Sequence, residues 1–195
     1  MDHYQIIASR FQQIMETVAM SVDHLADPIA RSSEMMTQVL LNDGRIFCCG
    51  RGIDAAIAQL FCGLLLENPD RERPALPAYN LGPGAAVQID ATGDAYARQI
   101  RALARDSDLL LVIDSGAGEP ACLDALHAAR EKGMPVIVMG NAHSDAVAAA
   151  LNAGDVHIEV EARQRSQCVE LHTMVALSLC QLIETSLFGD YHHQE

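Results

Sequence analysis

The chain has 195 residues, 50% of them hydrophobic and 20% charged, which is typical of one globular domain with a sizeable buried core. Its formal net charge is −13, so it lacks the basic footprint with which proteins contact nucleic-acid phosphates directly. No apolar stretch approaches the ~18 residues of a membrane span, and "MDHYQIIASRF" lacks the features of a signal peptide, so we expect a cytoplasmic protein without membrane association.

Two helices are expected before the first strand. Apolar side chains recur at helical spacing over residues 4–25, and "ADP" is expected to stop this helix. A second helix is predicted from about Pro28 to Leu41, with proline in its first turn, where the missing N–H does no harm. "NDG" then predicts a turn.

From residue 45 onward, strands and helices alternate. The predicted strands are 45–49, 76–81, 108–114, 134–140 and 155–160, and the predicted helices are 53–66, 94–105, 119–132, 144–152 and 166–188. The strand "DLLLVID" is almost entirely apolar and should be covered on both faces, whereas "DVHIEV" alternates and should lie at an edge. The six cysteines lie mostly in apolar runs without a Cys-x-x-Cys pair, and we expect buried thiols. The alternation predicts a parallel sheet with helices on both faces.

Two glycine-rich loops follow strands of this sheet, where ligands bind in such folds. "GRGID" supplies Gly50, Arg51, Gly52 and Asp54. "DSGAGEP" supplies a second candidate set: Asp114, Ser115, Gly116 and Glu119. Each loop opens a helix, whose free N–H groups and positive end could hold a phosphate. The alternatives are that glycine only permits a tight turn and that Asp54 and Glu119 only cap helices and stabilise the helix dipoles.

Several stretches, taken in order, resemble one known family. After two helices come strand-"CCGRG"-helix, "RERPALPAYNL", "RQIRALARDSDLLLVIDSGAGEP", "AAREKGMPVIVMG" and "VELHTMVALSLCQLIETSLFGD". This order is similar to the SIS-domain (sugar isomerase) family, and within it to phosphoheptose isomerases and to the non-catalytic DiaA-type proteins that bind the bacterial replication initiator DnaA. The resemblance covers nearly the whole chain.

The resemblance implies an α/β fold of SIS type, which is flavodoxin- or Rossmann-like. A five-stranded parallel sheet would be flanked by helices, in a single domain spanning residues 1–195. Residues 1–42 would form a helical pair used in oligomerisation, and residues 43–195 the α/β core with the C-terminal helix. The family further implies a homotetramer whose pockets hold sugar phosphate between subunits.

The resemblance also locates the chemistry of the isomerases, which exchange an aldehyde and a ketone through an enediol and need a proton-transferring base and acid. In the family a Glu and a His serve, and with another His and a Gln they bind zinc. The resemblance places these ligands at Leu60, Leu64, Val169 and Leu177, whose side chains can neither take a proton nor bind a metal. We therefore expect no zinc cofactor, no catalytic residue and no isomerase activity.

Two polar residues remain on the last helix, Glu170 and His172. Because residues two apart on a helix face different directions, they are not expected to form a metal pair. His172 is expected to be a partly buried histidine with a satisfied hydrogen bond.

The candidate phosphate loops also differ from those of sugar-binding members, which show "GNGGS" and "STSGNS". Arg51 stands for Asn, and Asp54, Asp114 and Glu119 stand for Ser; a carboxylate repels a phosphate where a hydroxyl would bind it. We hypothesise that Arg51 pairs with Asp54 or Asp114 and fills the pocket from within. Relatives tend to bring an Asn-Asp to the sugar, and Asp90 matches it only with a one-residue shift.

Two functions from different classes remain. The first is a homotetrameric DiaA-like adaptor for a DnaA-type partner, with Leu187 and Phe188 at the end of the long helix as the partner-binding pair, because DiaA-type proteins carry a similar Leu-Phe there. The alternative for Phe188 is that it closes the core or the tetramer. The second function is a phosphoheptose isomerase, converting sedoheptulose 7-phosphate, or another sugar-phosphate-binding SIS protein.

Overall fold

A five-stranded parallel sheet forms the centre of the molecule. The computed structural model describes residues 2–67, 72–82, 95–116, 118–143, 147 and 149–190. The strands are β1 (Ile46–Gly50), β2 (Ala78–Asn80), β3 (Leu109–Ile113), β4 (Val136–Asn141) and β5 (Val156–Val160). They lie in the order β2-β1-β3-β4-β5, and every neighbouring pair is parallel. The predicted sheet, with the alternating strand β5 at one edge, is confirmed.

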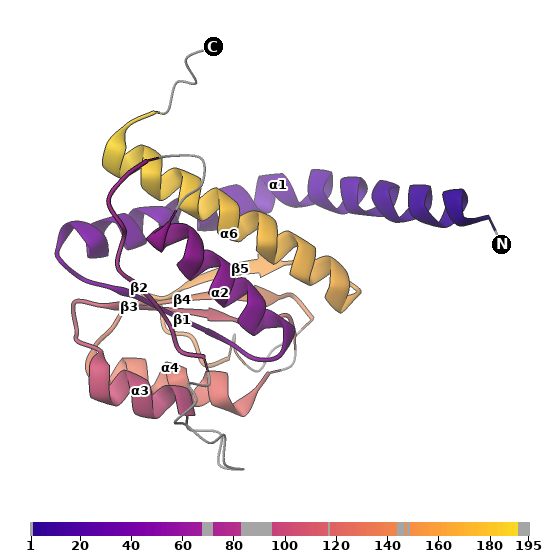
Figure 1. The fold of residues 1–195 in the computed structure, drawn as a ribbon. Helices are drawn as coiled ribbons and strands as arrows, with labels where there is room; N and C mark the ends of the chain where they lie inside the picture. Colours follow the sequence, from indigo (N-terminus) through magenta and orange to yellow (C-terminus); the bar gives the residue numbers. More distant parts are fainter. Residues whose placement is uncertain are drawn as a thin grey trace.

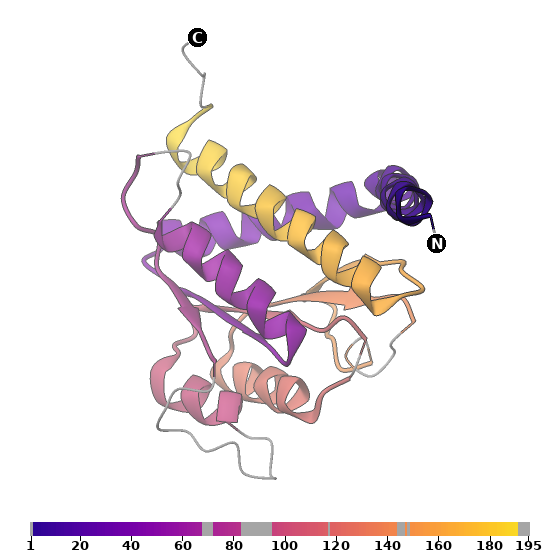
Figure 2. The ribbon, with the colours of Figure 1, turned by 45° about the vertical axis from the view of Figure 1, so that its right-hand side comes forward.

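Helices cover both faces of this sheet (Figures 1 and 2). On one face lie α1 (His3–Leu41), α2 (Ile53–Leu66) and α6 (Arg165–Phe188), and on the other lie α3 (Ala95–Leu103) and α4 (Pro120–Lys132). Successive strand residues serve opposite faces: Leu111 packs in the core under α2 and α6, whereas Leu110 packs in the core under α3 and α4. Both faces of the central strands are therefore shielded from solvent, which explains their continuous apolar runs.

The N-terminal segment departs from the prediction, because α1 is one helix of 39 residues that continues through Pro28. Proline inside a helix removes one backbone hydrogen bond and destabilises the helix by about 3 kcal/mol. Leu25 before the proline and Ile29 after it nevertheless pack into the same core beside α6. Because residues on both sides of the proline pack into this core, the helix continues where the local sequence predicts that it ends. The first turns of α1 extend past the rest of the fold (Figure 1), with Arg10 paired to Glu170 of α6 and Val18 packed against the core.

Two predicted helices extend into parts of the chain outside the described residues. Residue 94, the first of the predicted helix 94–105, lies there, and α3 ends at Leu103. Residues 144–146 and 148 of the predicted helix 144–152 also lie there. Val147 is helical, as predicted, whereas residues 149–152 form a turn and irregular backbone.

Two further expectations concern burial. All six cysteines are free and buried, as predicted. Among the described residues, α6 alone has the length and apolar composition to cross a membrane, but 44% of its apolar window is buried within the fold. It packs between α1 and α2 (Figure 2), which is the position of a core helix.

Candidate functional site

Three loops meet at the carboxyl end of the sheet, and a buried carboxylate joins them. Asp54, in the first turn of α2, is only 2% exposed. Its Oδ2 accepts hydrogen bonds from the backbone N–H of Ser115 at 3.1 Å and from the Ser115 hydroxyl at 2.9 Å. The Arg165 guanidinium, from the start of α6, lies 3.2 Å from the same oxygen and donates to the Ser115 hydroxyl at 2.8 Å. Asp54, Ser115 and Arg165 thus tie together the loops after β1, β3 and β5.

A second carboxylate, that of Asp114, is bound by its own loop. It accepts from the N–H of Gly116 at 3.2 Å and from the N–H of Gly118 at 2.9 Å. Both glycines have positive φ, 119° and 59°, a conformation that other residues rarely adopt. The N–H groups of Ser115, Gly116 and Gly118 are therefore directed at the chain's own carboxylates.

The hypothesis that Arg51 pairs with Asp54 or Asp114 is wrong. Arg51 instead lies beside Glu119, with Nε 3.5 Å from its carboxylate, and the two side chains are 45% and 32% exposed. Such a pair contributes little, because water screens it. The cation that holds Asp54 is Arg165, which the sequence reasoning missed. Its place after the last strand, at the same edge as the two glycine-rich loops, is the signal that could have indicated it.

The structure supports a purely structural role for the glycines of the first loop, but it does not show capping by Asp54 or Glu119. A Cβ added at Gly50 would lie 2.8 Å from the backbone of Asp54, and Gly52 has a φ of 63°, so both glycines are required by the turn itself. Neither Asp54 nor Glu119 makes a side-chain capping hydrogen bond, although both stand at helix starts. Asp90 lies outside the described residues.

Four apolar side chains occupy the positions at which the resemblance places zinc ligands. Leu60 and Leu177 are 39% and 47% exposed, while Leu64 and Val169 are half-buried against the core below α2 and α6. None of the four carries a donor atom for a metal, so this set of residues does not fit zinc. In the described part of the chain, no group of three or more His, Cys, Asp or Glu side chains is arranged to hold a metal ion.

Comparison with known proteins identifies the scaffold. A family model described as the SIS domain matches residues 10–141. The chain belongs to the SIS-domain family. It is 33% identical to a phosphoheptose isomerase of Azoarcus sp. strain BH72 over 194 residues, covering 97% of this chain and 98% of the relative.

Solved structures agree with this SIS-domain assignment. A phosphoheptose isomerase from Francisella tularensis superimposes with a TM-score of 0.86 at 28% identity, over 95% of this chain and all of the other. One from Neisseria gonorrhoeae gives 0.86 at 26% identity, over 93% and 98%. The SIS-type fold predicted from the sequence is thereby confirmed.

The two polar residues on α6 of this SIS-domain protein face apart, as predicted. His172 is fully buried, with Nε2 3.1 Å from the carbonyl oxygen of Gly140, and this burial lowers the pKa of the imidazole. Glu170 instead forms an ion pair with Arg10 of α1. His172 is thus a core histidine with a satisfied hydrogen bond, more deeply buried than expected.

The predicted partner-binding pair ends α6. Leu187 is half-buried and packs against the core, whereas Phe188 is 37% exposed. A buried ion pair between Arg73 and Glu184, 2.6 Å apart, fixes the preceding turn of α6. Phe188 is therefore the member of the pair that presents its side chain outward.

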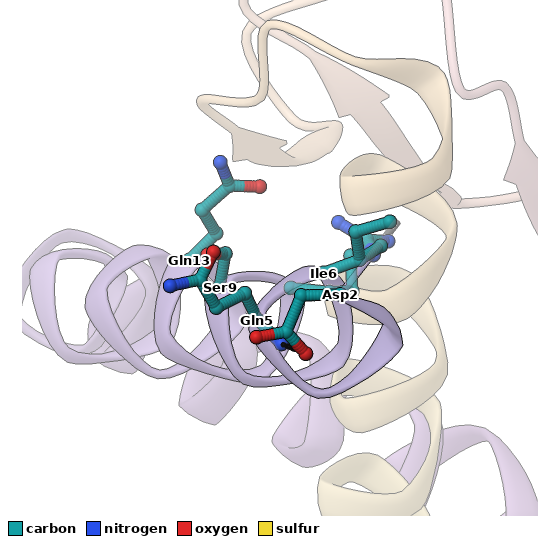
Figure 3. A pocket seen from close by; sticks show the side chains of 6 residues that line it. Asp2, Gln5, Ile6, Ser9 and Gln13 are labelled. Carbon is teal, nitrogen blue, oxygen red and sulfur yellow. Dashed lines mark hydrogen bonds between the residues drawn. The ribbon is translucent and has the colours of Figure 1, made fainter.

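Several hollows on the surface lie along α1, and one of them, of about 590 Å³, also borders the loop after β5 through Glu161, Arg163 and Gln164. Another follows the first turns of α1, where Figure 3 shows polar side chains along a single helix; it is lined by Asp2, Gln5, Ile6, Ser9, Arg10 and Gln13. A third, of about 190 Å³, is a mainly apolar groove between α1 and α6. Its floor includes Val18, Leu25 and Met174.

Proposed function

We propose that this SIS-domain protein is a non-catalytic, cytoplasmic adaptor that works as a homo-oligomer, most simply a tetramer, and binds a DnaA-type replication initiator. The observation that carries the proposal is the set of donor-free side chains at Leu60, Leu64, Val169 and Leu177. Aldehyde–ketone exchange requires a group that removes a proton from carbon and a group that returns it. An aliphatic side chain can do neither.

The loops support the same proposal electrostatically. A phosphate entering them would meet the carboxylates of Asp54 and Asp114, both 2% exposed. Two like charges ~4 Å apart repel by about 4 kcal/mol at an effective dielectric near 20. A neutral hydrogen bond returns only about 1 kcal/mol. The N–H groups of Ser115, Gly116 and Gly118 are already engaged by these carboxylates, so a sugar phosphate gains little from them that would offset this repulsion.

An adaptor needs a surface for its partner, and the end of α6 supplies one. Phe188 is 37% exposed at the end of α6, one turn beyond the buried Arg73–Glu184 pair. An aromatic side chain held in this way is the usual form of an interface anchor. Several copies of this surface on one oligomer would raise the apparent affinity for a partner that is itself multivalent.

The homo-oligomer is supported by the first turns of α1, which extend past the rest of the fold (Figure 1). Ile7, Phe11 and Met15 are all more than half exposed, at four-residue spacing on one stripe of this helix. An isolated helical arm of this length is marginal in water, and packing of its apolar stripe supplies most of the stability of such a helix. The apolar groove between α1 and α6 of a second copy offers a surface of matching character.

A pull-down of purified DnaA-type initiator tests the adaptor proposal. Wild-type protein and the control Leu103→Ala, which truncates a side chain 44% exposed on α3 at the far face of the sheet, are expected to retain the initiator. Phe188→Ala is expected to lose most of it, by at least about tenfold in Kd, as hot-spot residues do. Equal retention by Phe188→Ala would contradict the role of this surface. Failure of the wild-type protein to bind would contradict the partner.

The alternative is a phosphoheptose isomerase or a sugar-phosphate-binding SIS protein, and one observation favours it: the 33% identity to a protein named phosphoheptose isomerase extends over nearly the whole chain. An assay with sedoheptulose 7-phosphate, with zinc measured in the same sample, separates the two functions. Turnover together with about one zinc per subunit would establish the isomerase. Neither turnover nor stoichiometric zinc is expected for the adaptor.

A further inference from the structure

Asp54 occupies the point at which three loops converge, and it does so as a ligand would. We infer that Asp54 is a built-in anion that fills a latent anion site, and that Arg165 is the cation that holds it there. With Asp54 removed, the same Arg165 and the Ser115 donors would hold a phosphate-sized anion from solution. The inference rests on the loop contacts alone and is independent of the identity of any protein partner.

The contacts of Oδ2 are those of a bound anion. This single oxygen accepts from the Ser115 N–H at 3.1 Å, the Ser115 hydroxyl at 2.9 Å and the Arg165 guanidinium at 3.2 Å. Two of the three donors come from the loop after β3 and one comes from the start of α6, so none belongs to the loop that carries Asp54. A carboxylate reaching into donors supplied by two other loops is an internal substitute for a solute.

The other oxygen of Asp54 provides an independent observation. Oδ1 is buried, yet it has no hydrogen-bond partner among the residues that the structure describes. A buried carboxylate oxygen without a donor is unfavourable, so Asp54 fits the site through Oδ2 alone. A phosphate-sized anion that reached both the loop donors and water would leave no such oxygen unsatisfied.

Arg165 is placed to exchange one anion for another. Its side chain is 50% exposed, whereas Asp54 is 2% exposed, so the guanidinium bridges solvent and the buried carboxylate. A guanidinium binds carboxylate and phosphate oxygens with the same planar set of N–H donors. Asp114 remains nearby, bound to Gly116 and Gly118, and its charge limits the affinity of any anion that enters.

Calorimetric titration of the full-length protein with inorganic phosphate tests the inference. Wild type is expected to give no binding at millimolar phosphate, because its own carboxylate fills the site. Asp54→Ser removes the charge and makes room, and it is expected to bind phosphate at least about tenfold more tightly than wild type. The double variant Asp54→Ser with Arg165→Gln is expected to lose this gain. Asp124→Asn, which removes one negative charge from α4, is expected to behave as wild type.

Three outcomes would overturn the inference: equal phosphate binding by wild type and Asp54→Ser, no binding by a folded Asp54→Ser, or binding that survives the loss of Arg165. If Asp54→Ser does not fold, Asp54→Asn keeps the side-chain volume and serves instead. A smaller gain is expected there, because the amide still fills space, and it must again disappear with Arg165→Gln. A folded Asp54→Asn that binds no better than wild type would also overturn the inference.

Discussion

At the scale of single residues, two arginine–carboxylate pairs of this protein differ in burial and should differ in energy. The Arg73 and Glu184 side chains are 2% and 8% exposed, and Arg73 also donates to the carbonyl oxygens of Leu64 and Leu65 at the end of α2. Arg101 and Glu131, by contrast, are 46% and 56% exposed. The first pair joins two helices inside the protein, while the second is accessible to solvent.

Breaking the buried pair should therefore destabilise the protein much more than breaking the exposed one. Arg73→Met removes the guanidinium that lies beside the buried Glu184 carboxylate, and we expect a loss of about 3–5 kcal/mol in the free energy of unfolding. Arg101→Met is the control, and we expect a much smaller loss because water screens this exposed pair. Urea denaturation monitored by circular dichroism measures both changes. Similar losses for the two variants would show that burial does not set the energy of these pairs.

His172 should make the stability depend on pH. Burial lowers its folded-state pKa, so the unfolded chain takes up a proton before the folded protein does. The stability that this group contributes is complete above the unfolded pKa, about 6.5, and is lost as the pH falls toward the lowered folded value. Burial also lowers the pKa of His157, which adds to the same loss of stability at low pH.

Denaturation midpoints measured between about pH 7 and pH 5, above the range where carboxylates titrate, test this dependence. Wild type is expected to lose stability across this window. His172→Gln keeps a donor for the Gly140 carbonyl and should flatten the dependence of stability on pH. An unchanged slope in His172→Gln would exclude this histidine as its source.

At the scale of the elements, the turn between β1 and α2 depends on a glycine, whereas α1 continues through a proline. Gly50 lies against the backbone of Asp54, where no Cβ fits, whereas a Cβ at Gly63 in the middle of α2 would have nothing within 4 Å. Similarly, Pro28 lies inside a helix that continues on both sides of it. In each case, a pair of substitutions can test whether the backbone conformation or the side-chain packing determines the stability of the element.

The two glycines should respond in opposite directions to the same substitution. Gly50→Ala forces the loop away from Asp54 and is expected to destabilise the protein by about 1–3 kcal/mol. Gly63→Ala adds a methyl group in open space on a helix and is expected to stabilise it by about 0.5–1 kcal/mol. Thermal unfolding of the two variants and of wild type measures whether each substitution stabilises or destabilises the protein. A neutral Gly50→Ala would mean that the turn relaxes more easily than its close contact indicates.

Restoring a hydrogen bond in α1 should stabilise the protein. Pro28→Ala returns an N–H to the helix interior and removes the ring from the preceding turn, and we expect a gain of about 1–3 kcal/mol. The reverse substitution two residues away, Ala30→Pro, should destabilise by a similar amount. Denaturant titration compares them. No gain in Pro28→Ala would indicate that the helix is interrupted at this point in solution, as the sequence pattern alone predicts.

At the scale of the whole molecule, the arm formed by the first half of α1 is the feature that a single chain leaves exposed. Its apolar stripe of Ile7, Phe11 and Met15 is matched by no packing within the described residues, since each is more than half exposed. On the proposal of a homo-oligomer, this stripe is covered by other copies. The assembled state and the stability should then be linked through protein concentration.

A charge placed on this stripe should therefore dissociate the oligomer. Phe11→Asp is expected to shift the mass measured by light scattering from that of a tetramer toward smaller species, and to lower the Tm at micromolar concentration. Leu103→Asp on α3, at the opposite face of the sheet, is the control and should remain tetrameric. A monomeric wild type, or an unchanged mass for Phe11→Asp, would contradict the proposed interface.

The sequence by itself determined the architecture, because the spacing of apolar residues within short segments indicates both the type of element and its burial. Strands β1, β3 and β4 are continuous apolar segments and β5 alternates, so the parallel pairing and the edge position of β5 could be predicted. The absence of ligand atoms at Leu60, Leu64, Val169 and Leu177 could also be known from the chain, since a side chain's chemistry does not depend on its neighbours.

Only the tertiary structure decided how distant charges pair and whether a local stop signal is obeyed. Asp54 and Arg165 are 111 residues apart and meet because β1 and β5 end at the same edge of the sheet, while Arg51, three residues from Asp54, turns to Glu119 instead. Pro28 likewise fails to end α1, because Leu25 and Ile29 bury themselves in one core. Both outcomes depend on long-range packing, whose energy exceeds the local preferences that a sequence pattern records.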